Sequence, residues 1–176
     1  QIIVLEDTQT PVVVSLPQSQ TVECDGGGNT TEFNNWLSNN AFSVVTDDCG
    51  SVTFTPTQTA TPSGCSGTGC HTYSFTAEDG CGNVVNLGIA DFCIQDTEAP
   101  MITTPASDFN VTCNGSATAA INLWTAANGN AVASDACGNV TWSFSILTTN
   151  PSCVGNAYTT VYEFTATDDC GNSAST

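Results

Sequence analysis

The chain has 176 residues, a length that suits one large domain or two small ones. It carries 17 acidic residues and no Lys or Arg, which gives a formal net charge of −17. A chain without cationic side chains cannot neutralise phosphates, and this excludes nucleic acids and anionic membrane surfaces as partners. The carboxylates repel one another, so we expect divalent cations to offset their charge.

Short strands are predicted in chain order at residues 12–14, 21–23, 52–54 and 73–76, because these segments are rich in β-branched and aromatic side chains. Residues 31–37 break this pattern, since their apolar side chains have helical spacing. We predict a helix of one or two turns here that places Trp36 in the core. The same pattern recurs at 120–124 and predicts a second short helix around Trp124.

The second half of the chain repeats the first. Thr-Pro-Val-Val-Val at 10–14 corresponds to Ala-Pro-Met-Ile-Thr at 99–103, and the segment 73–83 corresponds to 162–172. These ordered matches predict two copies of one structural unit. The fold class is therefore expected to be all-β, with two tandem β-sandwiches. A Greek-key sandwich of about seven strands suits the length of each copy.

The two copies differ at their ends. The apolar strand that follows Cys81 has no full counterpart after Cys170, whereas Asp7-Thr8 near the start of the chain aligns with Asp96-Thr97. We therefore predict that residues 1–8 complete the second unit of a neighbouring copy, and that the two domains span 9–97 and 98–176. The predicted polymerisation strand consists of Ile2, Ile3, Val4 and Leu5.

This permuted arrangement has two physical interpretations. Each chain can insert its first strand into the preceding copy, or the sequence is one period of a long covalent tandem array. Both predict an open head-to-tail polymer, because the contact joins two different surfaces. The alternative is a truncated chain with an exposed strand edge, which is an aggregation liability.

Three motifs resemble a known family. They are Val-Glu-Cys-Asp-Gly-Gly-Gly-Asn at 22–29, Asp-Thr-Glu-Ala-Pro at 96–100 and Thr-Ala-Thr-Asp-Asp-Cys-Gly-Asn at 165–172. The chain resembles hyalin-repeat-like, immunoglobulin-like tandem repeats of large bacterial surface and adhesin proteins over essentially its whole length. The resemblance implies an immunoglobulin-like fold, secretion and tandem arrangement. The absence of Lys and Arg and the permuted ends depart from the family pattern.

Ten cysteines, an even number, predict disulfide bridges and an oxidising compartment, so the expected location is extracellular or at the cell surface. No apolar run approaches the ~20 residues that span a bilayer. Gln1 is followed at once by strand-like residues, which favours a mature or excised product. The order of the strands predicts the bridges Cys24–Cys65, Cys70–Cys93 and Cys113–Cys153, and matching turns at strand ends predict Cys49–Cys81 and Cys137–Cys170.

Acidic residues gather around the Asp-x-Cys-Gly turns and at the predicted domain junctions. Oxygen-rich ligands at turns suit Ca²⁺, although Asp also favours turns for its own local hydrogen bonds. We therefore expect Ca²⁺ as the bound ion. The candidate metal ligands are Glu6, Asp7, Asp47, Asp48, Glu78, Asp79, Asp96, Glu98, Asp135, Asp168 and Asp169.

Catalysis is not expected, because His71 is the only histidine and no nucleophile accompanies it. A zinc site at Cys65, Cys70 and His71 is also not expected, since the usual ligand spacing is missing. The expected function is that of a structural subunit of an extracellular filament, whose main partner is another copy of itself. The alternative is an adhesive or carbohydrate-binding module, and glycans are the second candidate partner. N-glycosylation sequons occur at Asn29, Asn110, Asn114 and Asn139.

Overall fold

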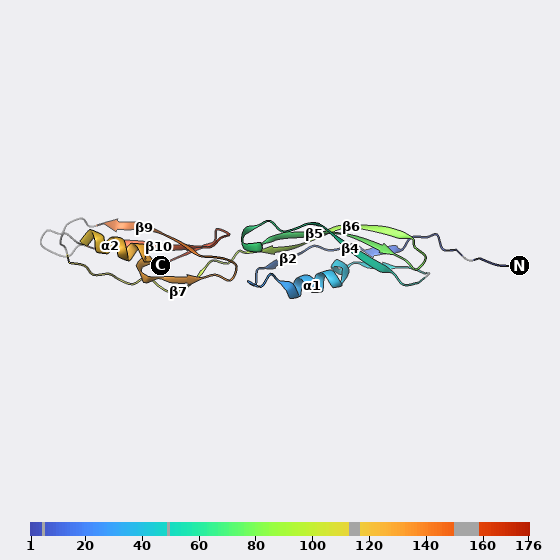
Figure 1. Ribbon diagram of the computed structural model, residues 1–176, viewed down its shortest axis with the longest axis horizontal. Helices are drawn as coiled ribbons and strands as arrows, with labels where there is room; N and C mark the ends of the chain where they lie inside the picture. The colour runs from blue at the N-terminus through green and yellow to red at the C-terminus, as the bar shows by residue number, and fades with distance from the viewer. Residues whose placement is uncertain (5, 49, 113–116, 150–158) are drawn as a thin grey trace. The chain divides into compact units, whose positions relative to one another are not determined.

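The computed structural model describes residues 1–4, 6–48, 50–112, 117–149 and 159–176 (Figure 1). Within these residues the chain is mostly β, which confirms the all-β prediction at this level. It divides into two compact units, Gln1–Gln95 (unit 1) and Asp96–Thr176 (unit 2). The division falls directly after a long strand, and residues 1–4 and 6–8 are assigned to unit 1.

Unit 1 contains two sheets and one helix. Strands β1 and β3 form an antiparallel pair, and the second sheet has the order β2-β6-β5-β4. In that sheet β2 runs parallel to β6, whereas the other neighbours are antiparallel. The elements are β1 (Val12–Ser15), β2 (Gln20–Glu23), α1 (Thr30–Ser38), β3 (Val44–Thr46), β4 (Thr53–Ala60), β5 (Gly69–Glu78) and β6 (Val84–Gln95), with 3₁₀ turns at Asn40–Phe42 and Cys65–Gly67.

The core of unit 1 forms between α1 and the inner face of the larger sheet. Side chains alternate between the two faces of a strand, so Ala90, Phe92 and Ile94 of β6 are all buried. The side chain of Trp36 is fully buried against them, as predicted for this helix. Its indole Nε1 donates a hydrogen bond of 2.8 Å to the backbone oxygen of Gln18, which satisfies the one polar group that the residue brings into the core.

Unit 2 repeats the order of elements in unit 1, except that its described residues contain no counterpart of β2, and its sheets are smaller. Strands β7 and β8 pair as β1 and β3 do, and the second sheet contains β9, β10 and β11. The pairing of β10 with β11 repeats that of β5 with β6 only over Thr165–Thr167. The elements are β7 (Met101–Thr104), α2 (Ala117–Ala126), β8 (Val132–Ser134), β9 (Thr141–Thr149), β10 (Thr160–Thr167) and β11 (Ser173–Ser175), with a 3₁₀ turn at Asn128–Asn130.

One disulfide joins Cys70 of β5 to Cys93 of β6, and their Cα atoms lie 4.0 Å apart. This confirms the predicted bridge, which followed from the antiparallel course of these two strands. The other disulfide-bonded cysteines among the described residues are Cys24, Cys65, Cys137 and Cys170, the set that two further predicted pairs require.

The remaining cysteine predictions have other outcomes. Cys81 is exposed and bonds to no cysteine among the described residues, and its predicted partner Cys49 lies outside them, so the Cys49–Cys81 bridge stays a prediction. The backbone at Gly50 lies close to the backbone at Gly80. A Cβ atom added to Gly50 would be 3.8 Å from the Cα and N atoms of Gly80. Three of the cysteines, Cys49, Cys113 and Cys153, lie outside the described residues.

Candidate functional site

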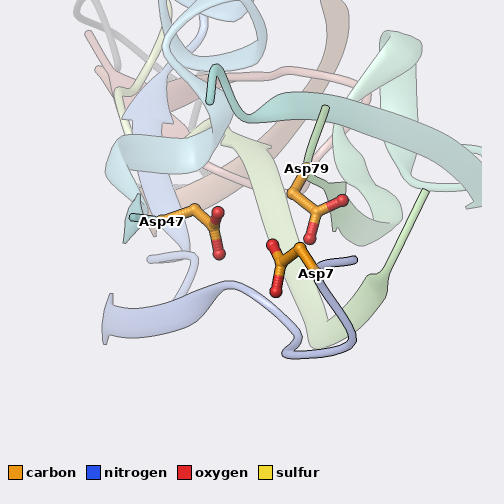
Figure 2. A group of neighbouring side chains, drawn as sticks. All are labelled: Asp7, Asp47 and Asp79. Carbon is orange, nitrogen blue, oxygen red and sulfur yellow. The ribbon is translucent and has the colours of Figure 1, made fainter. Parts of the chain in front are cut away.

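Three aspartates meet at one end of unit 1. Oxygens of the Asp7, Asp47 and Asp79 carboxylates all lie within 4.8 Å of one another. Figure 2 shows the three side chains, which come from separate segments of the chain, directed toward one shared space. Asp47 follows β3 and Asp79 follows β5, so the ends of two strands bring these carboxylates together with Asp7.

A network of hydrogen bonds fixes Asp79, the most buried member of the cluster. Its Oδ1 accepts hydrogen bonds from the backbone N–H groups of Cys81 (2.8 Å) and Asn83 (2.9 Å). Its Oδ2 accepts a hydrogen bond of 2.8 Å from the side-chain Nδ2 of Asn83. The same Nδ2 donates to the backbone oxygen of Asp7 at 3.2 Å, so Asn83 links the segment of Asp7 to the turn after β5.

Unit 2 contains a second cluster at the equivalent positions, formed by Asp96, Asp135 and Asp168. Asp168 accepts hydrogen bonds from the backbone N–H groups of Cys170 and Asn172 at 2.8 and 2.9 Å. The Nδ2 of Asn172 donates to Asp168 Oδ2 and to the backbone oxygen of Asp96, at 2.9 and 3.1 Å. The same arrangement is therefore built twice from two different stretches of sequence.

The pKa values of the two buried aspartates are shifted downward. Burial raises the pKa of Asp79, but hydrogen bonds from the side chain of Asn83 and from the backbone N–H groups of Asn83, Cys81 and Gly82 outweigh it. The pKa of Asp168 lies below its ordinary value for the same reasons, with Asn172 in the place of Asn83. Both carboxylates are therefore ionised at neutral pH and available as cation ligands.

These shifts predict how stability depends on pH. Because the folded-state pKa values are depressed, the ionised carboxylates stabilise the fold above the ordinary aspartate pKa of about 3.9. That contribution is lost as the pH falls through the folded-state values, so we expect the melting temperature to drop as the pH falls below about 4. Thermal unfolding followed by circular dichroism at successive pH values measures the effect.

A variant with Asp79→Asn and Asp168→Asn should show a shallower decline below about pH 4 than the unmodified chain. The matched control is Glu78→Gln, since Glu78 is exposed and lies outside the cluster. Equal slopes in the variant and in the unmodified chain would contradict the assignment of the depressed pKa values.

The clusters include six of the eleven acidic residues that the sequence singled out as metal ligands. Four others, Glu6, Asp48, Glu78 and Glu98, are exposed and belong to neither cluster. Asp169 also lies outside the clusters, and its Oδ2 accepts hydrogen bonds from the backbone and side-chain nitrogens of Asn139. Sequence reasoning missed the supporting roles of Asn83 and Asn172, although both occupy the same place in the repeated Cys-Gly-Asn motif.

The donor set of each cluster fits a hard cation. Three carboxylates supply only oxygen donors and a formal charge of −3, and Ca²⁺ takes six to eight oxygens from such groups. Zinc prefers nitrogen and sulfur donors, and the clusters contain neither. Asp7, Asp47 and Asp79 would hold one ion, and Asp96, Asp135 and Asp168 a second.

A second feature of unit 2 is an open strand edge. In unit 1, β6 pairs with β5 over the whole range from Gly69 to Glu78. In unit 2, β11 pairs with β10 only at Thr165–Thr167, and Phe164 adds two backbone hydrogen bonds with Thr176. Within the described residues, no strand pairs with Thr160–Glu163 on this side of β10. This stretch is called the open edge below.

The core of unit 2 is less covered than that of unit 1. Trp36 is fully buried, whereas its counterpart Trp124 is half-buried. Phe144 and Ile146 of β9 are each 50 % exposed. Trp124 still packs edge-on against Phe164, as Trp36 does against Phe75 in unit 1. The aromatic packing of the two cores is therefore similar, but the side chains of unit 2 are more exposed to solvent.

The predicted polymerisation strand lies outside both sheets of unit 1. Its side chains are 92 % (Ile2), 86 % (Ile3) and 70 % (Val4) exposed. The segment extends away from the strands of unit 1 in Figure 1. Leu5 lies outside the described residues.

Other residues that the sequence singled out have local packing roles. His71 contacts the ring of Phe33 at a centroid distance of 4.8 Å, its Nδ1 lies 3.1 Å from the side-chain nitrogen of Gln58, and burial lowers its pKa. Cys65 and Cys70 are disulfide-bonded, so neither offers a thiolate to zinc. Asn29 is buried and donates a hydrogen bond to the backbone oxygen of Glu23, which makes its sequon inaccessible in the folded unit.

Among the described residues, no helix has the length and apolar character needed to cross a membrane. Comparisons with protein-family models, with curated proteins and with solved structures find no match for this chain.

Proposed function

We propose that the chain is a structural subunit of an extracellular head-to-tail filament or surface stalk, built from immunoglobulin-like Greek-key sandwiches. In this proposal the open edge of unit 2 receives the polymerisation strand of a second copy. One observation carries it: β6 covers the edge of β5 in unit 1, whereas among the described residues no strand pairs with Thr160–Glu163 on the same edge of β10. The disulfides support an oxidising, extracellular location.

The exposed N-terminal segment supports the same proposal. Burying a side chain such as Ile or Val stabilises by about 1.5–3 kcal/mol, and Ile2, Ile3 and Val4 are all largely exposed. Adding this segment as a strand also supplies main-chain hydrogen bonds to an open edge. Because the strand and the edge are different surfaces, each added copy leaves a new strand and a new edge, so the assembly stays open.

Negative-stain electron microscopy, combined with denaturing non-reducing electrophoresis, tests this function. The expected result is filaments that collapse to a band at the 18.1 kDa of one chain. Filaments that remain one very large species on the gel would indicate a covalent tandem array. In such an array the polymerisation strand would be joined by a peptide bond to the end of the preceding repeat. Monomers alone, at every concentration tried, would contradict the structural function and favour the adhesive module.

We also propose that the two aspartate clusters bind Ca²⁺. A bound divalent cation would offset the repulsion among three carboxylates whose oxygens lie within 4.8 Å of one another. The hydrogen bonds from Asn83 and Asn172 hold one carboxylate of each cluster in place before the ion binds. This preorganisation lowers the cost of assembling the ligands.

We expect CaCl₂ to raise the melting temperature at pH 7 and a chelator to reverse the effect. An ion that binds only the folded state stabilises it by about 2.7 kcal/mol at 100 times its dissociation constant. Asp47→Asn in unit 1 and Asp135→Asn in unit 2 should each reduce this gain. Asp48→Asn is the matched control, because Asp48 is exposed and lies outside the cluster. An equal response of all three variants would rule out these ligands.

A further inference from the structure

We propose that the docked strand lies between β10 and residues 109–112, in the place that β6 takes between β5 and β2 in unit 1. This inference rests on the proposed head-to-tail function and specifies its partner and register. Its occupant is residues 1–4 of a second copy of this chain. The alignment of Asp7 with Asp96 sets an offset of 89 residues (96 − 7), and Tyr73 and Tyr162 share the same offset.

Unit 1 supplies the template for both sides of the docked strand. Phe92 of β6 lies opposite His71 on β5 and opposite Gln20 on β2. Cys93, the next residue, lies opposite Cys70 and Thr21. The pairing is antiparallel on the first side and parallel on the second.

The shared offset transfers this register to unit 2. Ile3 takes the position of Phe92 and lies opposite Thr160 on one side and Phe109 on the other. Val4 takes the position of Cys93 and lies opposite Thr159. No disulfide is expected at this junction, because Val4 and Thr159 replace the two bridged cysteines of unit 1.

The surface of unit 2 has the apolar groups that such a strand would cover. Residues 109–112 form no strand, and Phe109 is 41 % exposed. Phe109 stacks on the half-buried Trp124 at a centroid distance of 5.8 Å. In unit 1 the fully buried Phe92 lies 5.7 Å from Trp36, so Ile3 would enter the corresponding space beside Trp124.

Charge also favours this occupant. The chain has a net charge of −17, so two copies repel each other where their acidic segments meet. Residues 1–4 have no acidic side chain, and neither do the receiving residues 159–162. This strand and this edge can therefore approach each other without carboxylates opposed across the new pairing. The β-branched side chains of Ile2, Ile3 and Val4 suit an extended strand.

Cysteine pairs in the full chain test the register against β10. Val4→Cys with Thr159→Cys should give a ladder of cross-linked multimers on non-reducing gels, and reductant should abolish it. Ile2→Cys with Val161→Cys, which repeats the pairing of Asp91 with Thr72, is a second pair with the same expectation. The control is Ile3→Cys with Thr159→Cys, whose side chains would lie on opposite faces and should not cross-link.

Peptide mapping with a protease that cleaves at Glu separates the designed bridges from any that involve Cys81, since the chain has no Lys or Arg for trypsin. Hydrogen exchange tests the other side, where the amides of residues 109–112 should exchange at least tenfold more slowly in filaments than in monomers. Filaments that form without either cross-link, or with unchanged exchange at 109–112, overturn this register and leave the head-to-tail function standing. Unmodified chains that never assemble overturn both.

Discussion

Replacing Trp36 with Ala should unfold most of unit 1 under conditions in which the unmodified unit is stable. The indole is fully buried and contacts Phe75 and Phe92 at centroid distances of 5.8 and 5.7 Å. Deleting a buried Trp side chain costs about 3–5 kcal/mol, because it removes apolar burial and leaves a cavity. That cost is a large share of the roughly 5–15 kcal/mol that stabilises a typical domain. Urea unfolding followed by circular dichroism measures it.

Two matched variants sharpen this prediction. Trp36→Phe keeps an aromatic ring and loses the hydrogen bond to Gln18, so it should cost much less than Trp36→Ala. Trp124→Ala should cost less than Trp36→Ala in the isolated chain, since Trp124 is half-buried there. An equal loss of stability at both tryptophans would contradict the difference in cover between the two units.

Removing the Cys70–Cys93 bridge should be the second large effect. The bridge closes a loop of 23 residues, and chain-entropy arguments assign such a crosslink about 3 kcal/mol. The variant in which both cysteines become Ala should therefore unfold at a clearly lower urea concentration. The bridge ties the last residues of β6 to the first residues of β5, so its loss should loosen this end of the sheet first.

Cys81→Ala is the control for this experiment. Cys81 is exposed and bonds to no cysteine among the described residues, so replacing it should change stability by no more than about 0.5 kcal/mol. Reduction of the unmodified chain should lower its stability at least as much as the double variant does, because reduction also opens the disulfides of Cys24 and Cys65. If the double variant and the control unfold at the same urea concentration, the bridge does not contribute to the stability of unit 1.

The repeat in the sequence predicted much of this architecture. Two matching segments gave the two helices with Trp36 and Trp124 and the main strands, and the antiparallel course of two of these strands gave the Cys70–Cys93 bridge. The parallel pairing of β2 with β6 was not predicted, because apolar alternation within a strand does not identify its neighbour.

For the candidate metal ligands, the sequence predicted the turns that carry them but not which acidic residue of each turn joins a cluster. Sequence reasoning could name the acidic turns but could not separate Asp47 from Asp48, or Asp79 from Glu78. Neighbouring side chains point to different sides of the backbone, so a single position decides whether a carboxylate enters the cluster or faces solvent. That choice depends on how strand ends meet in three dimensions, which composition and spacing do not contain.

The Cys70–Cys93 bridge has a mechanical consequence for a chain that is pulled from its two ends. The chain between the bridged cysteines cannot lengthen, even after unit 1 has lost its sheets. A fully extended stretch of 23 residues would span about 80 Å. While the bridge is intact, this length cannot add to the end-to-end distance of the stretched chain. Force applied to the oxidised protein should therefore release a shorter tether from unit 1 than force applied after reduction, so the bridge limits how far unit 1 can be stretched.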